Sequence, residues 1–258
     1  MGHYDTLFGR DEQELRRLQL LGEIFDSATI AQVRALDIGP GSRCLEVGAG
    51  AGSVAKLICN LVTPSPVIAT DISIDALDSV DAPNLQRIRH DVTTDQFPEG
   101  TFDLIHARFV LSHIRTRDDV MRRMASWLAP GGWLFIESFN WFPIDSSTNP
   151  EYLLVMKAWE SLIRETIGTD ARWSRSYPKD FTDIGLVDVG ATVNVNYING
   201  GSSLAKFWQL TLKTSREKLI NGYVTAEQFD RTLLLFNDPT FWDIAPAIIQ
   251  GWGRRPLI

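Results

Sequence analysis

The residues of this chain with the clearest chemistry lie between Cys44 and Ser53, where one acid is followed by regularly spaced glycines. The acid is Glu46, and the glycines are Gly48, Gly50 and Gly52. Glycine adopts backbone conformations that other residues avoid, so this spacing predicts a tight turn whose N–H groups approach a ligand closely. An apolar run precedes the turn and a helical pattern follows it, so we expect a strand, a turn and a helix start.

Glu46 limits the kinds of ligand that this turn can bind. A dinucleotide site places a pyrophosphate on the helix N-terminus, and a carboxylate two residues before the first glycine would repel that anion. Ser53 stands where the third glycine of G-x-G-x-x-G belongs, and no Lys-Ser/Thr pair of a P-loop follows. The pattern favours a nucleoside ligand that carries positive charge and no phosphate. S-adenosylmethionine, with its sulfonium and amino groups, is such a ligand.

Two more acids follow the next expected strands. Asp71 ends the apolar run 66–71, and Asp91 follows the run 85–89 after one intervening residue, His90. Sheets of alternating strands and helices bind ligands at the carboxyl ends of their strands. Because an ionised carboxylate only accepts hydrogen bonds, Asp71 suits a ribose diol, Asp91 an adenine amine, and Glu46 the cofactor's amino end. Each acid alone is more simply a helix cap, but the ordered set predicts a cofactor site.

The candidates for catalysis follow the fourth and fifth expected strands. Methyl transfer is an in-line displacement, so it depends on positioning and needs a base only where the acceptor loses a proton. His113 is the candidate base, and a histidine bonded to backbone at a helix start is the alternative. Glu137 would orient an amine or hydroxyl, with a helix cap as the alternative. We expect His106 to pack beside the cofactor loop and His90 to be structural.

Substrate-binding candidates are aromatic or lie near the N-terminus. Six of the eight tryptophans follow residue 140, and aromatic residues there are either ordinary core or the lining of an apolar pocket. Trp141 is the candidate among them, and Tyr4 with Arg10 would fold over the site as a lid. The four histidines are scattered and no metal-binding motif is present, so we expect no metal.

The elements that position these residues alternate along the first half of the chain. Helical patterns cover 11–25 and 27–36, and a later helix is expected to be capped at Thr116. Strands are expected at the following ranges: from Cys44, 66–71, 85–89, 102–106 and 133–137. Strands separated by helical segments of this length form parallel βαβ units. The chain is therefore predicted to be a doubly wound α/β sheet.

The second half of the chain is less regular. Helices are expected at 152–166, 203–220 and 225–236, and strands at 186–198 and within 241–252. We expect a single domain over residues 1–258. Its expected parts are an N-terminal helical lid (1–36), a cofactor-binding core (37–139) and a C-terminal part (140–258) with cap insertions at about 140–176 and 199–238.

Composition excludes several classes of protein. A formal net charge of −7 and a pI near 5.1 argue against binding of nucleic acid. No apolar run is long enough to span a membrane, and two cysteines make neither a disulfide scaffold nor a zinc site. Nothing resembles a signal peptide, so we expect a cytoplasmic protein.

With these motifs in order, the chain resembles the class I S-adenosylmethionine-dependent methyltransferases over residues 37–139. It is most similar to the small-molecule branch that includes ubiquinone/menaquinone-biosynthesis enzymes and enzymes of bacterial secondary metabolism. The resemblance implies a Rossmann-like, mostly parallel seven-stranded sheet that ends in an antiparallel hairpin, with helical cap elements. It also implies that the following residues bind the cofactor: Glu46, Gly48, Ala49, Gly50, Gly52, Asp71, Ile72, Asp91, Val92, Ala107, Arg108 and Phe109.

The activity that this resemblance implies is methyl transfer to an O, N or C centre of a largely apolar or aromatic small molecule, as in natural-product biosynthesis, by a monomer or homodimer. Methylation of nucleic acid is disfavoured, since His106-Ala107-Arg108-Phe109 stands where such enzymes carry an N/D-P-P-Y/F type motif. One alternative is an enzyme of this fold that uses the bound cofactor for cyclisation or rearrangement. Another is a non-catalytic, cofactor-binding partner subunit, and an NAD-dependent oxidoreductase is the weakest.

Overall fold

The computed structural model describes residues 12–258, so the lid candidates Tyr4 and Arg10 lie outside the described residues. The contacts of the chain form two compact units. The sheet unit contains Phe25–Ser138, Trp173–Thr192 and Ile249–Ile258. The helical unit contains the described residues Glu12–Ile24, Phe139–Arg172 and Val193–Ile248. The predicted lid, core and cap boundaries stay a prediction.

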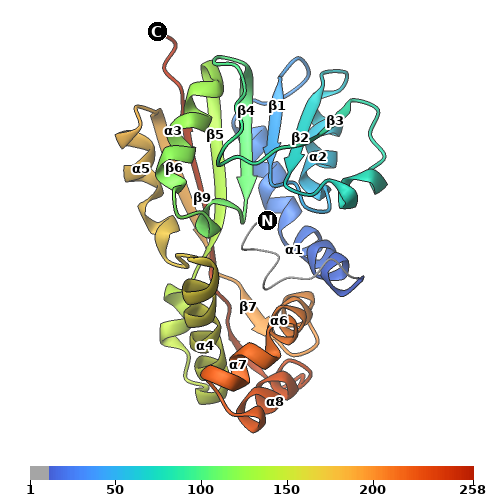
Figure 1. Ribbon diagram of the computed structural model, residues 1–258, viewed down its shortest axis with the longest axis vertical. Coiled ribbons are helices and arrows are strands. Elements are labelled where there is room, and N and C mark those ends of the chain that lie inside the picture. Colours follow the sequence, from blue (N-terminus) through green and yellow to red (C-terminus); the bar gives the residue numbers. More distant parts are fainter. Residues whose placement is uncertain (1–11) are drawn as a thin grey trace. The chain divides into compact units, whose positions relative to one another are not determined.

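The sheet unit is built around a seven-stranded sheet, in the order β3-β2-β1-β4-β5-β9-β6 (Figure 1). Its strands are β1 (Cys44–Val47), β2 (Val67–Asp71), β3 (Leu85–Arg89), β4 (Phe102–Arg108), β5 (Leu128–Asn140), β6 (Val187–Asn194) and β9 (Ala247–Arg254). The pairs β3·β2, β2·β1, β1·β4 and β4·β5 are all parallel. The predicted doubly wound, mostly parallel sheet of seven strands is confirmed.

Successive side chains of a strand point to opposite faces, and this alternation divides the core in two. Cys44 and Leu104 pack with the end of α1 (Glu12–Ala35) and with α2 (Ser53–Val62). Their neighbours Leu45 and Ile105 pack with α3 (Arg117–Trp127) and α5 (Tyr177–Asp183) on the other face. Glu46 lies two residues beyond Cys44, so its side chain faces α1 and α2.

The predicted pair of N-terminal helices is wrong, because residues 12–35 form the single helix α1. Asp26 and Thr29 resemble the polar residues that end or begin helices. In the structure their side chains are bonded to other elements of the sheet unit, so they do not interrupt the helix. Thr116 lies at the N-cap position of α3, as predicted, but its side chain makes no capping hydrogen bond.

The C-terminal strands differ in detail from the prediction. Residues 186–198 form β6 and a separate short strand β7 (Tyr197–Asn199) rather than one long strand. β7 pairs antiparallel with β8 (Trp242–Ile244) in a second, two-stranded sheet. β6 and β9 are neighbours in the main sheet, as expected of the terminal strands.

The helical unit contains α4 (Pro150–Ile167), α6 (Ser203–Thr214), α7 (Arg216–Gly222) and α8 (Ala226–Leu235). Its core is aromatic: Trp141 contacts Phe139 and Trp208, and its indole N–H donates to the carbonyl oxygen of Met156 (3.3 Å). Trp141 is 3% exposed and is part of this core, which agrees with the alternative that the aromatic residues are ordinary core; its contact with a substrate stays a prediction. None of the described helices is long and apolar enough to cross a membrane.

Candidate functional site

The glycine turn lies between β1 and α2, as the sequence predicted. Gly48, Gly50 and Gly52 all have positive φ angles, of 68°, 54° and 78°, which residues with a Cβ rarely adopt. Gly48 is also crowded, since a Cβ there would lie 2.3 Å from a methyl group of Val110. The backbone of Ala49 donates to the Thr70 carbonyl oxygen (2.9 Å), which holds the turn against the end of β2.

Asp71 lies directly beside this turn. Its Oδ2 accepts a hydrogen bond from the Gly50 N–H (2.9 Å), and its Oδ1 accepts one from the Ser73 N–H (3.2 Å). The carboxylate is half-buried at the end of β2, and Ile72 follows it with similar exposure. The structure therefore brings together the glycine turn and the acid that sequence analysis assigned to the ribose.

Asp91 lies at the adjacent strand end, because β3 pairs with β2 and places Arg89 opposite Asp71. One oxygen of its exposed carboxylate accepts hydrogen bonds from the backbone N–H (2.9 Å) and the hydroxyl (2.6 Å) of Thr93. Asp91 thus caps a local turn rather than the helix that sequence analysis gave as the simpler alternative. Val92 is buried beside it. The adenine contacts of Asp91 and Val92 stay a prediction.

The segment after β4 is strained at Phe109, whose φ of 60° is unusual for a residue with a side chain. Its N–H donates to the Glu137 carbonyl oxygen (2.9 Å). Its ring packs edge-on against that of Phe25 in α1, with the ring centroids 5.8 Å apart. Ala107 is fully buried on the opposite face. The Arg108 guanidinium donates to the Asp26 carboxylate (2.8 Å). Its contact with the cofactor stays a prediction.

His113 belongs to a short 3-10 turn, Leu111–His113, which follows Val110 directly. Its side chain is half-buried and its backbone N–H donates to the Val110 carbonyl oxygen (3.0 Å). Val110 is the residue that packs against Gly48 of the glycine turn. The candidate base thus lies on a segment in contact with the expected cofactor loop.

Three buried ionisable residues form a line across β1, β4 and β5. His106 lies between two glutamates, with Nδ1 2.6 Å from Glu46 Oε2 and Nε2 2.9 Å from Glu137 Oε2. The exposed fractions are 0% for His106, 2% for Glu46 and 1% for Glu137. The three face α1 and α2 because they alternate with Leu45, Ile105 and Ile136, which pack on the other face.

The charges in this line stabilise each other. Burial by itself would lower the pKa of His106, but the two carboxylates outweigh that effect and raise it to about 9. Burial would raise the pKa of Glu137, yet the hydrogen bond and charge of His106 hold it below its ordinary value. At neutral pH the imidazole is therefore protonated and donates from both nitrogens.

Glu137 has two further donors. The Thr29 hydroxyl donates to its Oε2 (2.7 Å), and the Gln250 side chain donates to its Oε1 (2.6 Å). Among the described residues Glu46 has one side-chain partner, His106. Three protein donors therefore enclose the Glu137 carboxylate. Its role in orienting a substrate stays a prediction.

Sequence reasoning missed the partners Asp26, Thr29 and Gln250, and it gave His106 no specific contact. The available signal was the polar residues at alternate positions of otherwise buried strands, His106 and Arg108 in β4 and Glu137 in β5. Buried charged groups need partners, so these positions pointed to a network.

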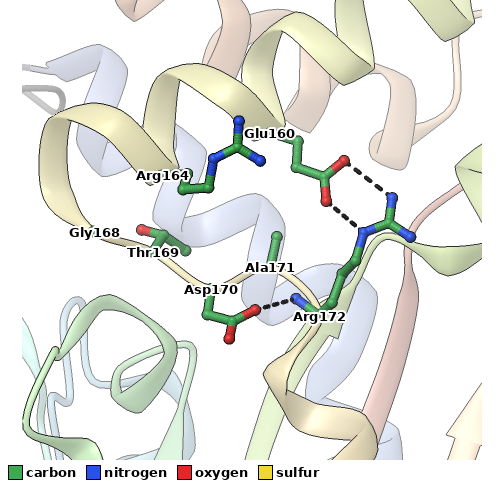
Figure 2. Close-up of a pocket in the computed structure, with 7 residues that line it drawn as sticks. All are labelled: Glu160, Arg164, Gly168, Thr169, Asp170, Ala171 and Arg172. Carbon is green, nitrogen blue, oxygen red and sulfur yellow. Dashed lines mark hydrogen bonds and ion pairs between the residues drawn. The ribbon is translucent and has the colours of Figure 1, made fainter.

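A cavity of about 330 Å³ lies elsewhere, in the helical unit at the end of α4 (Figure 2). Arg172 on its wall is bound by both oxygens of Glu160, at 2.6 and 3.1 Å, and its backbone N–H donates to Asp170 (3.0 Å). None of the predicted site residues lines this cavity. It therefore contributes nothing to the cofactor site.

The glycine turn, the acids at the strand ends and the sheet order together define a class I, Rossmann-like methyltransferase fold. Residues 17–180, well over half of the chain, match the methyltransferase-domain family. The chain belongs to this family, and the predicted membership is confirmed. The family uses S-adenosylmethionine, which agrees with the cofactor expected from Glu46 and the glycines.

Curated relatives are methyltransferases. The chain is 30% identical over 133 residues to Methyltransferase str2 of Strobilurus tenacellus, which is 51% of this chain and 48% of that protein. It is 29% identical over 112 residues to the ubiquinone/menaquinone biosynthesis C-methyltransferase UbiE of Ectopseudomonas mendocina, covering 40% and 44% of the two chains. The chain thus spans just under half the length of these two relatives.

Solved structures share the fold at low identity. The YcgJ protein of Bacillus subtilis aligns with a TM-score of 0.62 and 16% identity, over 89% of this chain and 99% of that one. The Haemonchus contortus phosphoethanolamine N-methyltransferase 2, solved with S-adenosyl-L-methionine, aligns with a TM-score of 0.62 and 15% identity, over 99% and 60%. The [4+2]-cyclase SpnF aligns with a TM-score of 0.55 and 14% identity, over 90% and 82%.

Proposed function

We propose that this protein is an S-adenosylmethionine-dependent methyltransferase that acts on an O, N or C centre of a largely apolar or aromatic small molecule. The observation that carries the proposal is the hydrogen bond from the Gly50 N–H to the Asp71 carboxylate, 2.9 Å long. It places a glycine turn and an acceptor-only side chain at one strand edge, as a nucleoside with a charged amino-acid end requires.

The residues fit that cofactor. Gly48, Gly50 and Gly52 allow the positive φ angles of the turn, and the two oxygens of Asp71 suit a ribose diol. Glu46 supplies negative charge at the start of the turn, where the cofactor's amino end would bind. Asp91 and Val92 follow the next strand, β3, and we propose that they contact the adenine. When bound, the cofactor supplies a methyl group on a sulfonium.

The chain's own contribution to the reaction is positioning and, for some acceptors, proton transfer. His113 is the group that we propose takes a proton from a hydroxyl or protonated amine, since it follows Val110, which packs on the turn. A carbon nucleophile that is already activated would need no such base. Relatives named as UbiE C-methyltransferases and as a phosphoethanolamine N-methyltransferase support a small-molecule acceptor without selecting one.

Thermal unfolding tests the cofactor first. The protein is unfolded with S-adenosylmethionine, S-adenosylhomocysteine, NAD or no addition. A ligand at about a hundredfold over its dissociation constant adds roughly 2.7 kcal/mol, which raises Tm by about 5–10 °C in a chain of this size. A shift with the two adenosyl compounds alone supports the proposal, and a shift with NAD alone contradicts it.

Turnover tests the reaction. A panel of phenols, amines and activated carbon acids is incubated with the protein, and S-adenosylhomocysteine is measured. Its accumulation with one acceptor class supports methyl transfer. Cofactor binding combined with product formation but no S-adenosylhomocysteine would instead support cyclisation or rearrangement, and binding with no turnover over the panel would support a partner subunit.

A further inference from the structure

We infer that one chain of hydrogen bonds, through β4, β5 and α1, clasps both ends of the cofactor loop and orients the Glu46 carboxylate for the cofactor's amino-acid end. The inference rests on the proposed function. It assigns positioning roles to side chains outside the loop, among them Thr29 and Asp26 of α1 and His106 of β4. We call this chain of hydrogen bonds the clasp; its members are Glu46, His106, Glu137, Thr29, Arg108, Asp26 and Ser53.

The clasp begins before the glycines. Glu46 lies in β1, two residues before Gly48, and its carboxylate accepts from His106 (2.6 Å). His106 also donates to Glu137 (2.9 Å), which accepts from the hydroxyl of Thr29 (2.7 Å). Three strands and one helix are thereby joined through side chains that are all buried.

The clasp returns to the chain directly after the last glycine. Arg108 donates to the Thr29 hydroxyl (3.0 Å) and to Asp26 (2.8 Å). Asp26 in turn accepts from the hydroxyl of Ser53 (3.1 Å), which is the first residue of α2. The residues on either side of the loop from Val47 to Gly52, Glu46 and Ser53, are therefore connected to each other through these hydrogen bonds.

Charge balance explains why the clasp would favour an ammonium group at Glu46. The clasp contains the carboxylates of Glu46, Glu137 and Asp26 but only two cationic groups, those of His106 and Arg108, so one further cation would balance its charge. Three protein donors surround Glu137, whereas Glu46 has one side-chain partner among the described residues. A carboxylate has two oxygens and room for several donors, so the remaining acceptor capacity is at Glu46. An ammonium group there would complete the pairing of a buried charge.

The test distinguishes binding of the cofactor's amino-acid end from binding of its adenosine. Calorimetry measures the binding of S-adenosylhomocysteine and of 5′-methylthioadenosine, which has the adenosine but no amino-acid end. The variant Thr29→Val removes the bridging hydroxyl at constant shape and leaves the loop sequence intact. Thr232→Val is the matched control, because Thr232 is an equally buried helical threonine of α8 whose hydroxyl is bonded within the helical unit.

We expect Thr29→Val to weaken S-adenosylhomocysteine binding by about tenfold or more and to change methylthioadenosine binding less than twofold. Thr232→Val should change neither. His106→Gln, which keeps one donor, is expected to show the same selective loss, and unfolding curves confirm that each variant is folded. Equal losses for both ligands, or no loss for either in Thr29→Val, would overturn the clasp while leaving the proposed function intact. Wild-type protein that binds neither ligand would overturn both.

Discussion

Nδ1 of His106 lies 2.6 Å from Oε2 of Glu46, although 60 positions separate the two residues in the chain. Parallel pairing of β1 with β4 sets Glu46 directly opposite His106, and the alternation of each strand directs both side chains to the same face. The sheet register therefore determines this contact. Because the contact favours the protonated form of His106, the free energy of unfolding depends on whether His106 is protonated.

The variant His106→Gln tests this charge. The folded-state pKa of His106 is raised to about 9 from an unfolded value near 6.5. Its stabilising effect is therefore complete below about pH 6.5 and is lost as the pH rises through about 9. We expect wild-type protein to lose on the order of 3 kcal/mol over this window relative to the variant. Urea unfolding at several pH values measures the difference.

Other groups titrate in the same region, so the comparison must be between the two proteins. Burial raises the pKa of Cys44 and that of Cys59, and their ionisation in the unfolded state also lowers stability at high pH. These groups are common to both proteins and cancel in the difference. Parallel pH profiles for wild type and His106→Gln would show that His106 is neutral in the folded state.

Asp71→Ala tests the ribose contact. A hydrogen bond to a charged group contributes roughly 1.5–3 kcal/mol, so the affinity for S-adenosylhomocysteine should fall by that amount. Asp81→Ala removes an exposed acid from the same part of the chain and serves as the control. Calorimetry measures both. Unchanged affinity in Asp71→Ala would exclude the ribose assignment.

Gly48→Ala tests the crowding of the turn, with Gly100→Ala as its control. The two glycines have nearly equal φ angles, +68° and +70°, but an added Cβ meets Val110 at 2.3 Å only at Gly48 and finds open space at Gly100. Both variants carry a backbone cost of about 1–2 kcal/mol. Gly48→Ala should lose a further 1–3 kcal/mol, roughly, from overpacking. Chemical denaturation should show partial recovery when Val110→Ala is added, and equal losses at the two glycines would contradict the crowding.

His113→Ala tests the proposed base once an acceptor is known. We expect turnover of a hydroxyl acceptor to fall by roughly 10²–10⁴-fold, because a positioned base contributes that much, with unchanged affinity for S-adenosylhomocysteine. Kinetic assays with saturating cofactor measure the loss. Wild-type turnover in this variant would return His113 to a structural role.

Trp141→Ala distinguishes a core role for Trp141 from the predicted substrate contact. Trp141 is 3% exposed and packs against Trp208, so its truncation should destabilise the protein by about 3–5 kcal/mol. Trp242→Ala truncates a tryptophan that is 61% exposed and should cost much less. Denaturant unfolding measures both losses. A Trp141→Ala protein of normal stability but without turnover would restore the substrate role.

Local physics made the strand edge predictable from sequence. Glycines at alternate positions after an apolar run specify a turn with positive φ angles, and an acid after such a run lies where parallel strands end. The glycine turn and Asp71 therefore lie where they were expected. The alternation of strands and helices in the first half of the chain was also predictable, because the periodic spacing of apolar residues within a single segment indicates a strand or a helix.

The sequence by itself thus determined the class of fold, the cofactor loop and the acids around it. Tertiary structure decided which groups face which. Asp26 falls between the two predicted helices, and nothing local shows that β4 and β5 supply partners for Asp26 and Thr29. Glu137 looks like a free strand-end acid until His106, Thr29 and Gln250 enclose it. These contacts depend on sheet register and helix packing between distant segments, and no local pattern encodes them.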